Sequence, residues 1–215
     1  KYNVLPLDDR RVERFIPSIA GRPTLVKGNK QIYFPGMKRI SEATVLDVKN
    51  KSFQVTAQIV VPAQGAQGTL VAIGGSYGGW GFMLEKGAAR FVYNLFGVQT
   101  FVIDANKTLP SGEHQVRAEF KYAGGGPAKG GDITFYYDGE AAGGGKIPLT
   151  QPVVFSATEG LDIGRELGTP VLPTAKAEDT VFNGKIKWVE LSAGEDDHSH
   201  MIEPDAYMRM IMAKQ

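Results

Sequence analysis

The chain of 215 residues has a formal net charge of +1, and this near-neutral balance argues against a nucleic-acid-binding protein, which needs a basic stripe. It contains no cysteine, which excludes disulfides, thiol catalysis and zinc sites built on thiolates. No apolar run approaches the roughly 18–20 residues of a transmembrane helix, so the sequence predicts no membrane span.

Residues 1–30 lack the pattern of a strand. Leu5–Arg11 carries dense mixed charge, with Asp8, Asp9, Arg10 and Arg11 in a row, and prolines and glycines interrupt the residues that follow. Because the chain begins within this irregular, charged stretch, we interpret residues 1–30 as a segment that connects the folded part to a preceding domain.

Residues 31–194 are predicted to form a single all-β domain. In Gln115–Tyr122 apolar and polar residues alternate strictly, which is typical of a half-buried antiparallel strand. The 27 glycines, nearly twice the usual share of about 7%, cluster between apolar runs, and Lys86-Gly87 and Asp138-Gly139 are strong hairpin signals. About a dozen short strands separated by turns predict a sandwich or a barrel. The expected strands are Gln31–Phe34, Phe53–Val61, Thr69–Ile73, Gly81–Glu85, Arg90–Leu95, Thr100–Ile103, Glu113–Tyr122, Asp132–Tyr137, Pro152–Phe155, Leu161–Gly164 and Lys185–Leu191.

Residues 195–215 are predicted to form a polar loop and a short C-terminal helix. Glu203-Pro204-Asp205 places proline and acids where a helix begins, and apolar residues follow at helical spacing. The loop contains Asp196, Asp197, His198 and His200. Two histidines this close can share a metal ion, but nothing in the sequence holds them rigid, so we interpret the loop as solvated and predict no metal site.

Three acids near residue 160 suggest a glycanase as one alternative function. Glycanases pair carboxylates on one face of a strand, and Glu159, Asp162 and Glu166 are the candidates. Glu159 and Asp162 are three residues apart, which puts them on opposite faces of a regular strand. Only a bulge would bring them together.

Aromatic residues near a glycine-rich turn suggest a second alternative, a carbohydrate-binding module. Tyr77 and Trp80 lie within Gly74–Gly81, and with Tyr93 they would line a groove in which flat rings stack on sugars. Trp188 alternates with Ile186 and is predicted to lie in the core.

Several short segments, in order, resemble the region that follows the catalytic domain in large bacterial arylsulfatases. They cover residues 1 to about 194: Lys1–Arg10, Gly74–Gly81, Val92–Gly97, Leu109–His114, Phe120–Gly126, Lys129–Gly131, Leu161–Arg165 and Gly168–Val171. The resemblance implies a C-terminal antiparallel jelly-roll sandwich of the concanavalin A-like lectin type. It also implies a non-catalytic accessory domain that packs on the sulfatase catalytic domain of the same polypeptide and shapes substrate access.

The resemblance assigns no catalytic residue to this chain. In that family a Cys or Ser in a C/S-x-P-S-R motif becomes formylglycine and works with a calcium ion, so both are expected only in the missing catalytic domain. The motif is absent here, because Pro17-Ser18 is followed by Ile19 and not by the arginine that the motif requires. Asp8, Asp9, Arg10, Arg11 and Arg165 are the predicted inter-domain contacts. A homo-oligomer and a bound carbohydrate remain open as further partners, and so does the compartment, bacterial cytoplasm or periplasm.

Overall fold

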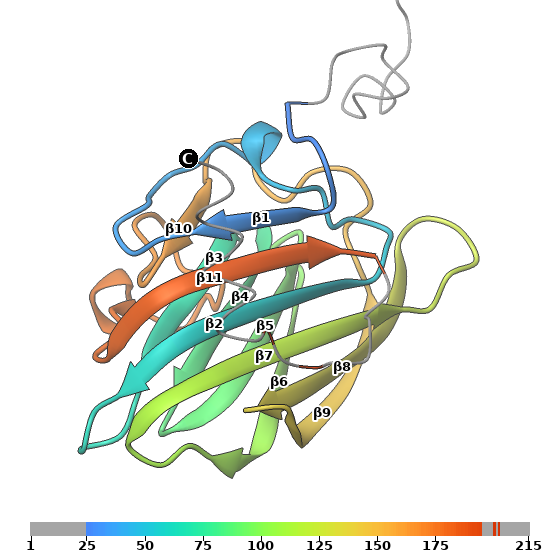
Figure 1. Cartoon of the computed structure of the whole chain (residues 1–215). Coiled ribbons are helices and arrows are strands. Elements are labelled where there is room, and N and C mark those ends of the chain that lie inside the picture. The colour runs from blue at the N-terminus through green and yellow to red at the C-terminus, as the bar shows by residue number, and fades with distance from the viewer. Residues whose placement is uncertain (1–24, 195–199, 201, 203–215) are drawn as a thin grey trace, which may run out of the picture.

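A computed structural model describes residues 25–194, 200 and 202. In this part of the chain two antiparallel sheets pack face to face, with the six-stranded sheet as the front layer in Figure 1 and the five-stranded sheet behind it. The six-stranded sheet runs β1 (Lys30–Tyr33), β11 (Lys185–Ala193), β2 (Phe53–Val61), β7 (Gly112–Tyr122), β8 (Lys129–Tyr137) and β9 (Glu140–Leu149). The five-stranded sheet runs β10 (Leu161–Ile163), β3 (Gly68–Gly75), β4 (Gly78–Glu85), β5 (Ala88–Leu95) and β6 (Gln99–Thr108).

The predicted all-β antiparallel sandwich is therefore confirmed. Helical structure in the described residues is limited to two 3-10 turns, η2 (Glu42–Thr44) and η3 (Ala177–Thr180). The helix predicted within residues 195–215 lies outside the described residues, and so does the connecting segment up to residue 24.

The alternation seen in the sequence sets the two faces of the six-stranded sheet. Val116 and Ala118 of β7 are buried between the layers, and they pair with Ala57 and Val55 of β2. The intervening residues, such as Gln115 and Arg117, face away from the other sheet. Because side chains alternate along a strand, one register fixes which residues form the core.

Both predicted hairpin turns are present. Lys86 and Gly87 have φ of +51° and +81°, and Asp138 and Gly139 have +50° and +85°. Positive φ at both central residues is the signature of the type I′ turn, whose twist matches that of the flanking strands.

One predicted strand is absent, and one observed strand was not predicted. Residues 152–155 form no strand. Instead the Gln151 side-chain amide donates to the carbonyl oxygens of Val154 (3.1 Å) and Phe155 (3.4 Å) and folds this stretch into a loop.

Strand β9 was not predicted, because Gly143–Gly145 has little strand propensity. Glycine is required at position 145 because a Cβ there would lie only 2.9 Å from Cγ2 of Ile103 in the opposite sheet.

Four aromatic rings form the centre of the core. Trp80 stacks on Phe91 with centroids 5.5 Å apart and lies at 5.5 Å from Phe53, which in turn lies 5.3 Å from Phe120. Phe53 and Phe120 come from the six-stranded sheet and the other two from the five-stranded sheet, so the cluster joins the two layers.

Tyr137 provides a polar connection between the layers. Its hydroxyl accepts a hydrogen bond from the Ala89 amide (2.7 Å) and donates one to the Lys107 carbonyl (3.0 Å), and burial raises the pKa of this phenol. We expect Tyr137→Phe to lower the free energy of unfolding by about 1–2 kcal/mol, because the buried Ala89 amide and the partly buried Lys107 carbonyl lose their partner. Urea unfolding measures this change. A variant as stable as the wild type would show that water replaces the hydroxyl.

Candidate functional site

Two neighbouring turns expose apolar side chains at one end of the five-stranded sheet. Tyr77 in the β3–β4 turn is 76% exposed, and Phe96 and Val98 in the β5–β6 turn are 52% and 87% exposed. We call Ser76, Tyr77, Phe96 and Val98 the aromatic tip. Exposed apolar groups gathered in this way are typical of a binding surface.

The buried side chain of Asn94 holds the two turns together. Its amide nitrogen donates to the carbonyl oxygens of Gly75 (3.2 Å) and Ser76 (3.1 Å), and its oxygen accepts from the Gly97 amide (2.8 Å). At the base of the β3–β4 turn, Gly79 has φ of +144°, and a Cβ there would lie 2.0 Å from the Ile73 carbonyl oxygen. The base of this turn therefore requires glycine at position 79.

Polar groups lie beside the aromatic tip. The hydroxyl of Thr169 accepts from the amide (3.0 Å) and the hydroxyl (3.0 Å) of Ser76 and donates to the Glu159 carboxylate (2.8 Å). These hydrogen bonds are exposed to solvent. The tip thus combines an exposed phenol ring with hydroxyl and carboxylate groups.

The other two aromatic residues predicted to contact a ligand do not reach the surface. Trp80 is completely buried in the core, and Tyr93 is 3% exposed. The Tyr93 hydroxyl accepts from the Gln151 amide (2.7 Å), and burial raises its pKa. Both predictions are corrected, because a strand inside a glycine-rich stretch still alternates between core and solvent. Of the three predicted residues, only Tyr77 is available to a ligand.

The three acids considered for a glycanase bind the chain's own groups. Asp162 accepts from the amides of Arg39 (2.7 Å) and Leu167 (2.9 Å). Glu166 accepts from the Thr69 hydroxyl and the Val171 amide, and burial raises the pKa of its carboxyl. Strand β10 pairs with β3 without a bulge. The bulge that the glycanase interpretation needed is therefore absent from β10.

The predicted inter-domain contacts are only partly visible. Arg165 is half-buried, and its Nε atom is buried without a hydrogen-bond partner. Asp8, Asp9, Arg10 and Arg11 lie outside the described residues. Inter-domain contact by these five residues stays a prediction.

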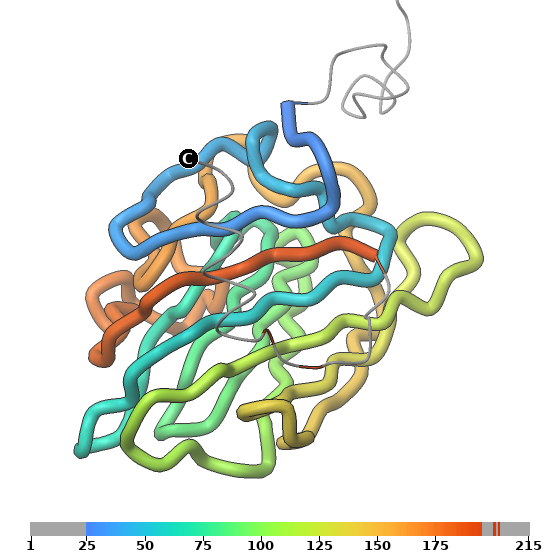
Figure 2. Tube along the Cα trace, viewed as in Figure 1, coloured from blue at the N-terminus to red at the C-terminus, as the bar shows by residue number. Residues whose placement is uncertain are grey.

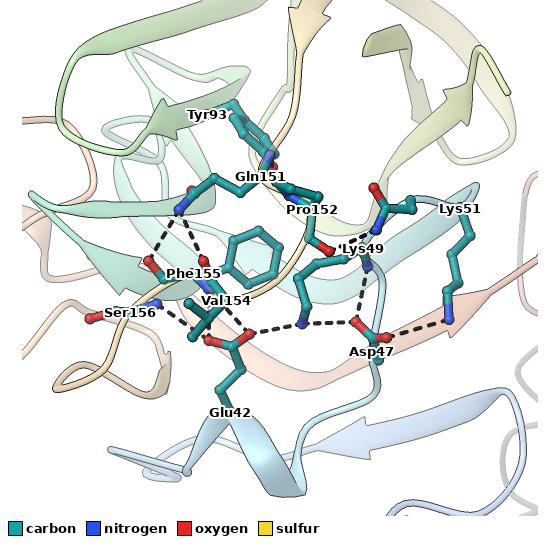
Figure 3. Close-up of polar contacts among 11 residues, drawn as sticks. Glu42, Asp47, Lys49, Lys51, Tyr93, Gln151, Pro152, Val154, Phe155 and Ser156 are labelled. Carbon is teal, nitrogen blue, oxygen red and sulfur yellow. Dashed lines mark hydrogen bonds and ion pairs between the residues drawn. The ribbon is translucent and has the colours of Figure 1, made fainter. Parts of the chain in front are cut away.

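Sequence reasoning missed a group of ion pairs at the same end of the sandwich as the aromatic tip, where the loop between β1 and β2 passes beside the loop after β9 (Figure 2). Lys49 Nζ lies 2.8 Å from a carboxylate oxygen of Glu42 and 2.8 Å from one of Asp47. The Glu42 carboxylate also accepts from the amides of Phe155 (2.9 Å) and Ser156 (3.3 Å), as Figure 3 shows. Glu42 lies 113 positions from Phe155, and no local pattern pairs the two loops.

Burial and charge act in opposite directions within this group. Burial by itself would lower the pKa of Lys49, but Glu42 and Asp47 outweigh it and raise that pKa. Burial by itself would raise the pKa of Asp47, but the positive charge and hydrogen bonds of Lys49 outweigh burial, so the pKa of Asp47 is lowered. The group holds the two loops together and offers no unpaired reactive atom.

A cleft of about 290 Å³ lies between strands β3 and β4 and the segment around η3. It is lined by Gln67, Gly68, Thr69, Met83, Leu84, Glu85, Glu166, Leu172, Ala175, Asp179 and Thr180. Both oxygens of its buried carboxyl, that of Glu166, already accept hydrogen bonds. The Glu166 carboxyl is therefore already bound to the chain's own groups.

The outward side of the six-stranded sheet is polar. We call the following residues of β2, β7, β8 and β11 the polar face: Gln54, Thr56, Gln58, Gln115, Arg117, Glu119, Tyr136, Trp188 and Glu190. Trp188 belongs to it because a bulge between Ile186 and Trp188 shifts the register, so that Trp188 pairs with Gln58. Trp188 is buried, as predicted, at 5% exposure, but on the outward side of the sheet and not between the two sheets.

Two residues beyond β11 lie on this face. His200 stacks on Tyr136, and Ile202 is hydrogen-bonded to Gln115. The solvated position predicted for His200 is therefore wrong, while Asp196, Asp197 and His198 lie outside the described residues.

Comparison with known proteins shows the fold class. Models of protein families give no match, and neither do curated protein sequences. Among solved structures, the CBM40 module of the Ruminococcus gnavus IT-sialidase bound to α2,6-sialyllactose is similar, with a TM-score of 0.52 and 11% identity over 83% of this chain and 98% of that one. A part of the NanB sialidase from Streptococcus pneumoniae is also similar, with a TM-score of 0.53 and 11% identity over 73% of this chain and 24% of that one.

These similarities and the two-sheet topology define a β-sandwich of the concanavalin A-like lectin type, as predicted. At 11% identity they show the fold alone, and a fold hosts many functions. In the part of the chain that the structure describes, no helix is long and apolar enough to cross a membrane.

Proposed function

We propose that this chain is a non-catalytic module that binds glycans at the aromatic tip. The observation that carries the proposal is the exposed ring of Tyr77, next in the chain to Ser76, whose hydroxyl is bonded to Thr169 and through it to the carboxylate of Glu159. The CBM40 module of the Ruminococcus gnavus IT-sialidase, which shares the fold, binds sialyllactose. That similarity supports a glycan as the class of ligand.

The chemistry of the tip suits a sugar. A pyranose has an apolar face of C–H groups and an edge of hydroxyls. The phenol ring of Tyr77 offers an apolar surface to the C–H face of the sugar, and Phe96 and Val98 extend that surface. Glu159 can accept hydrogen bonds from the sugar hydroxyls, and Thr169 can accept or donate them.

We further propose that the module is an accessory domain of an arylsulfatase-like sulfuric ester hydrolase. The ordered resemblance of eight short segments supports this parentage. In this proposal the formylglycine, the calcium ion and the hydrolysis belong to the catalytic domain, while this module packs on that domain and holds a sulfated or plain glycan near it. The reading frame upstream of Lys1 tests the parentage: a C/S-x-P-S-R motif is expected there, and a frame without one would contradict it.

The glycan proposal is tested by substitution of Tyr77. We expect Tyr77→Ala to weaken binding about tenfold, because one aromatic contact contributes about 1 kcal/mol beyond its buried area. Tyr77→Phe keeps the ring and should bind like the wild type. Calorimetry with α2,3- and α2,6-sialyllactose and a panel of sulfated glycans measures both. No binding by the wild type, or equal binding by Tyr77→Ala, would contradict the proposal.

A further inference from the structure

The polar face is buried although it lies on the outward side of its sheet. Outward side chains of a two-layer sandwich normally reach water. Here Gln115 and Arg117 are each 5% exposed and Glu190 is 3% exposed. Polar side chains this deeply buried require hydrogen-bond partners. The partners that the structure describes beyond the sheet are Gly194, whose carbonyl accepts from Gln54 (3.0 Å), and His200 and Ile202.

Gln115 binds the main chain of Ile202 at both of its polar groups. The Ile202 amide donates to Oε1 of Gln115 (2.6 Å), and the Ile202 carbonyl accepts from Nε2 of Gln115 (2.9 Å). A side-chain amide offers one acceptor and one donor side by side, which matches the two groups of a single peptide residue. This contact recognises polypeptide backbone and is independent of the bound side chain.

His200 adds contacts that depend on its side chain. Its ring stacks on Tyr136 with the centroids 4.2 Å apart and the planes 7° apart. Its Nδ1 lies 2.9 Å from Oε1 of Glu119, which also accepts from Nε of Arg117 at 2.6 Å. His200 has φ of +51°, a conformation that non-glycine residues adopt infrequently. A planar ring with a hydrogen-bonding nitrogen fits between Tyr136 and Glu119.

We propose that the polar face is a polypeptide-binding surface and that His200 and Ile202 occupy it as an intramolecular ligand. Gln115 holds the backbone of the bound segment, while Tyr136 and Glu119 select an aromatic ring that carries a hydrogen-bonding nitrogen. Any other polypeptide that binds this face must displace these two residues. This inference uses other residues than the aromatic tip and does not depend on glycan binding.

Amide hydrogen exchange at Ile202 tests the inference on the full chain. With isoleucine labelled by ¹⁵N, the Ile202 amide is expected to exchange at least about tenfold more slowly than in a free peptide of the same local sequence, because it is hydrogen-bonded to a buried side chain. The amide of Ile59 in the core serves as an internal reference for global unfolding. Exchange of Ile202 at the free-peptide rate would overturn the proposal.

Three variants separate specific binding from a change in folding. Gln115→Glu places a carboxylate oxygen against the Ile202 carbonyl and should return Ile202 to the free-peptide rate. His200→Ala removes the stacked ring without altering the sheet and should speed Ile202 exchange several-fold. Lys121→Ala, an exposed position on the same strand and the same side, should leave it unchanged. Slow exchange of Ile202 in both Gln115→Glu and His200→Ala would overturn the proposal, provided that Ile59 exchanges as in the wild type.

A peptide added in trans identifies the face as the binding surface. A synthetic peptide of residues 197–205 is expected to bind the full-length His200→Ala chain, shifting the Tyr136 ring resonances. The same peptide with alanine at the His200 position should bind at least about tenfold more weakly, since it lacks the ring. Equal binding of the two peptides, or shifts that avoid Tyr136, would overturn the role given to the ring.

Discussion

Trp80→Ala is expected to lower the free energy of unfolding by about 3–5 kcal/mol, the range for removal of a large aromatic side chain from a core. Trp80 is completely buried and contacts rings from both sheets, so its removal leaves a cavity between the layers. Urea unfolding followed by far-ultraviolet circular dichroism measures the change, with an unaltered m-value as evidence of an intact native state.

Two further variants give the controls for Trp80. Trp80→Phe keeps a ring in the stack and also removes the indole N–H, a buried donor that has no partner, so it should cost clearly less than Trp80→Ala. Tyr77→Ala, at an exposed ring, should change stability by no more than about 0.5 kcal/mol. A loss below about 1 kcal/mol for Trp80→Ala would contradict the core position.

Lys49→Met is expected to lower the free energy of unfolding by about 3 kcal/mol, because the removal of one partner leaves buried charge uncompensated. The Lys49 and Glu42 side chains are 11% and 15% exposed, and Lys49 lies between Glu42 and Asp47. The matched control is Lys51→Met. Lys51 lies 3.7 Å from the same Asp47, but it is 44% exposed, so its loss should cost less than about 1 kcal/mol. Equal effects of the two substitutions would show that burial is not decisive here.

The stabilisation from this group depends on pH in a defined direction. The folded pKa of Asp47 is lowered, so its contribution is present above the usual aspartate value of 3.8 and is lost as the pH falls through the lower, folded value. The folded pKa of Lys49 is raised, so its contribution is present below the usual lysine value of 10.5 and is lost as the pH rises through the higher, folded value. The stability difference between the wild type and Lys49→Met should therefore be constant near neutrality and shrink at both extremes.

Local patterns in the sequence were sufficient for the class of fold. The alternation in Gln115–Tyr122 identified strand β7 and its inward face, and Lys86-Gly87 and Asp138-Gly139 identified two type I′ hairpins. These features depend only on neighbouring residues, because side-chain direction alternates with position and a tight turn needs positive φ at fixed places.

The same patterns did not show which residues are accessible to a ligand. Trp80 lies three residues from Tyr77, yet its ring is in the core and that of Tyr77 is in water. The glycine-rich strand β9 follows the Asp138-Gly139 turn and pairs with β8, and glycine at position 145 leaves room for Ile103, which is distant in sequence. The bulge that turns Trp188 outward leaves no local sequence signal that alternation alone detects.

The patterns in the sequence by themselves determined an antiparallel all-β fold, a sandwich or a barrel, since the period of apolar residues and the placement of glycine act within a few residues of each other. Only the tertiary structure decided which aromatic rings are buried. It also joined Glu42 to the main chain of Phe155 and brought Gln115 to Ile202. Those pairs depend on how the two sheets and their loops meet in space, because contacts across many tens of residues follow from packing and strand order.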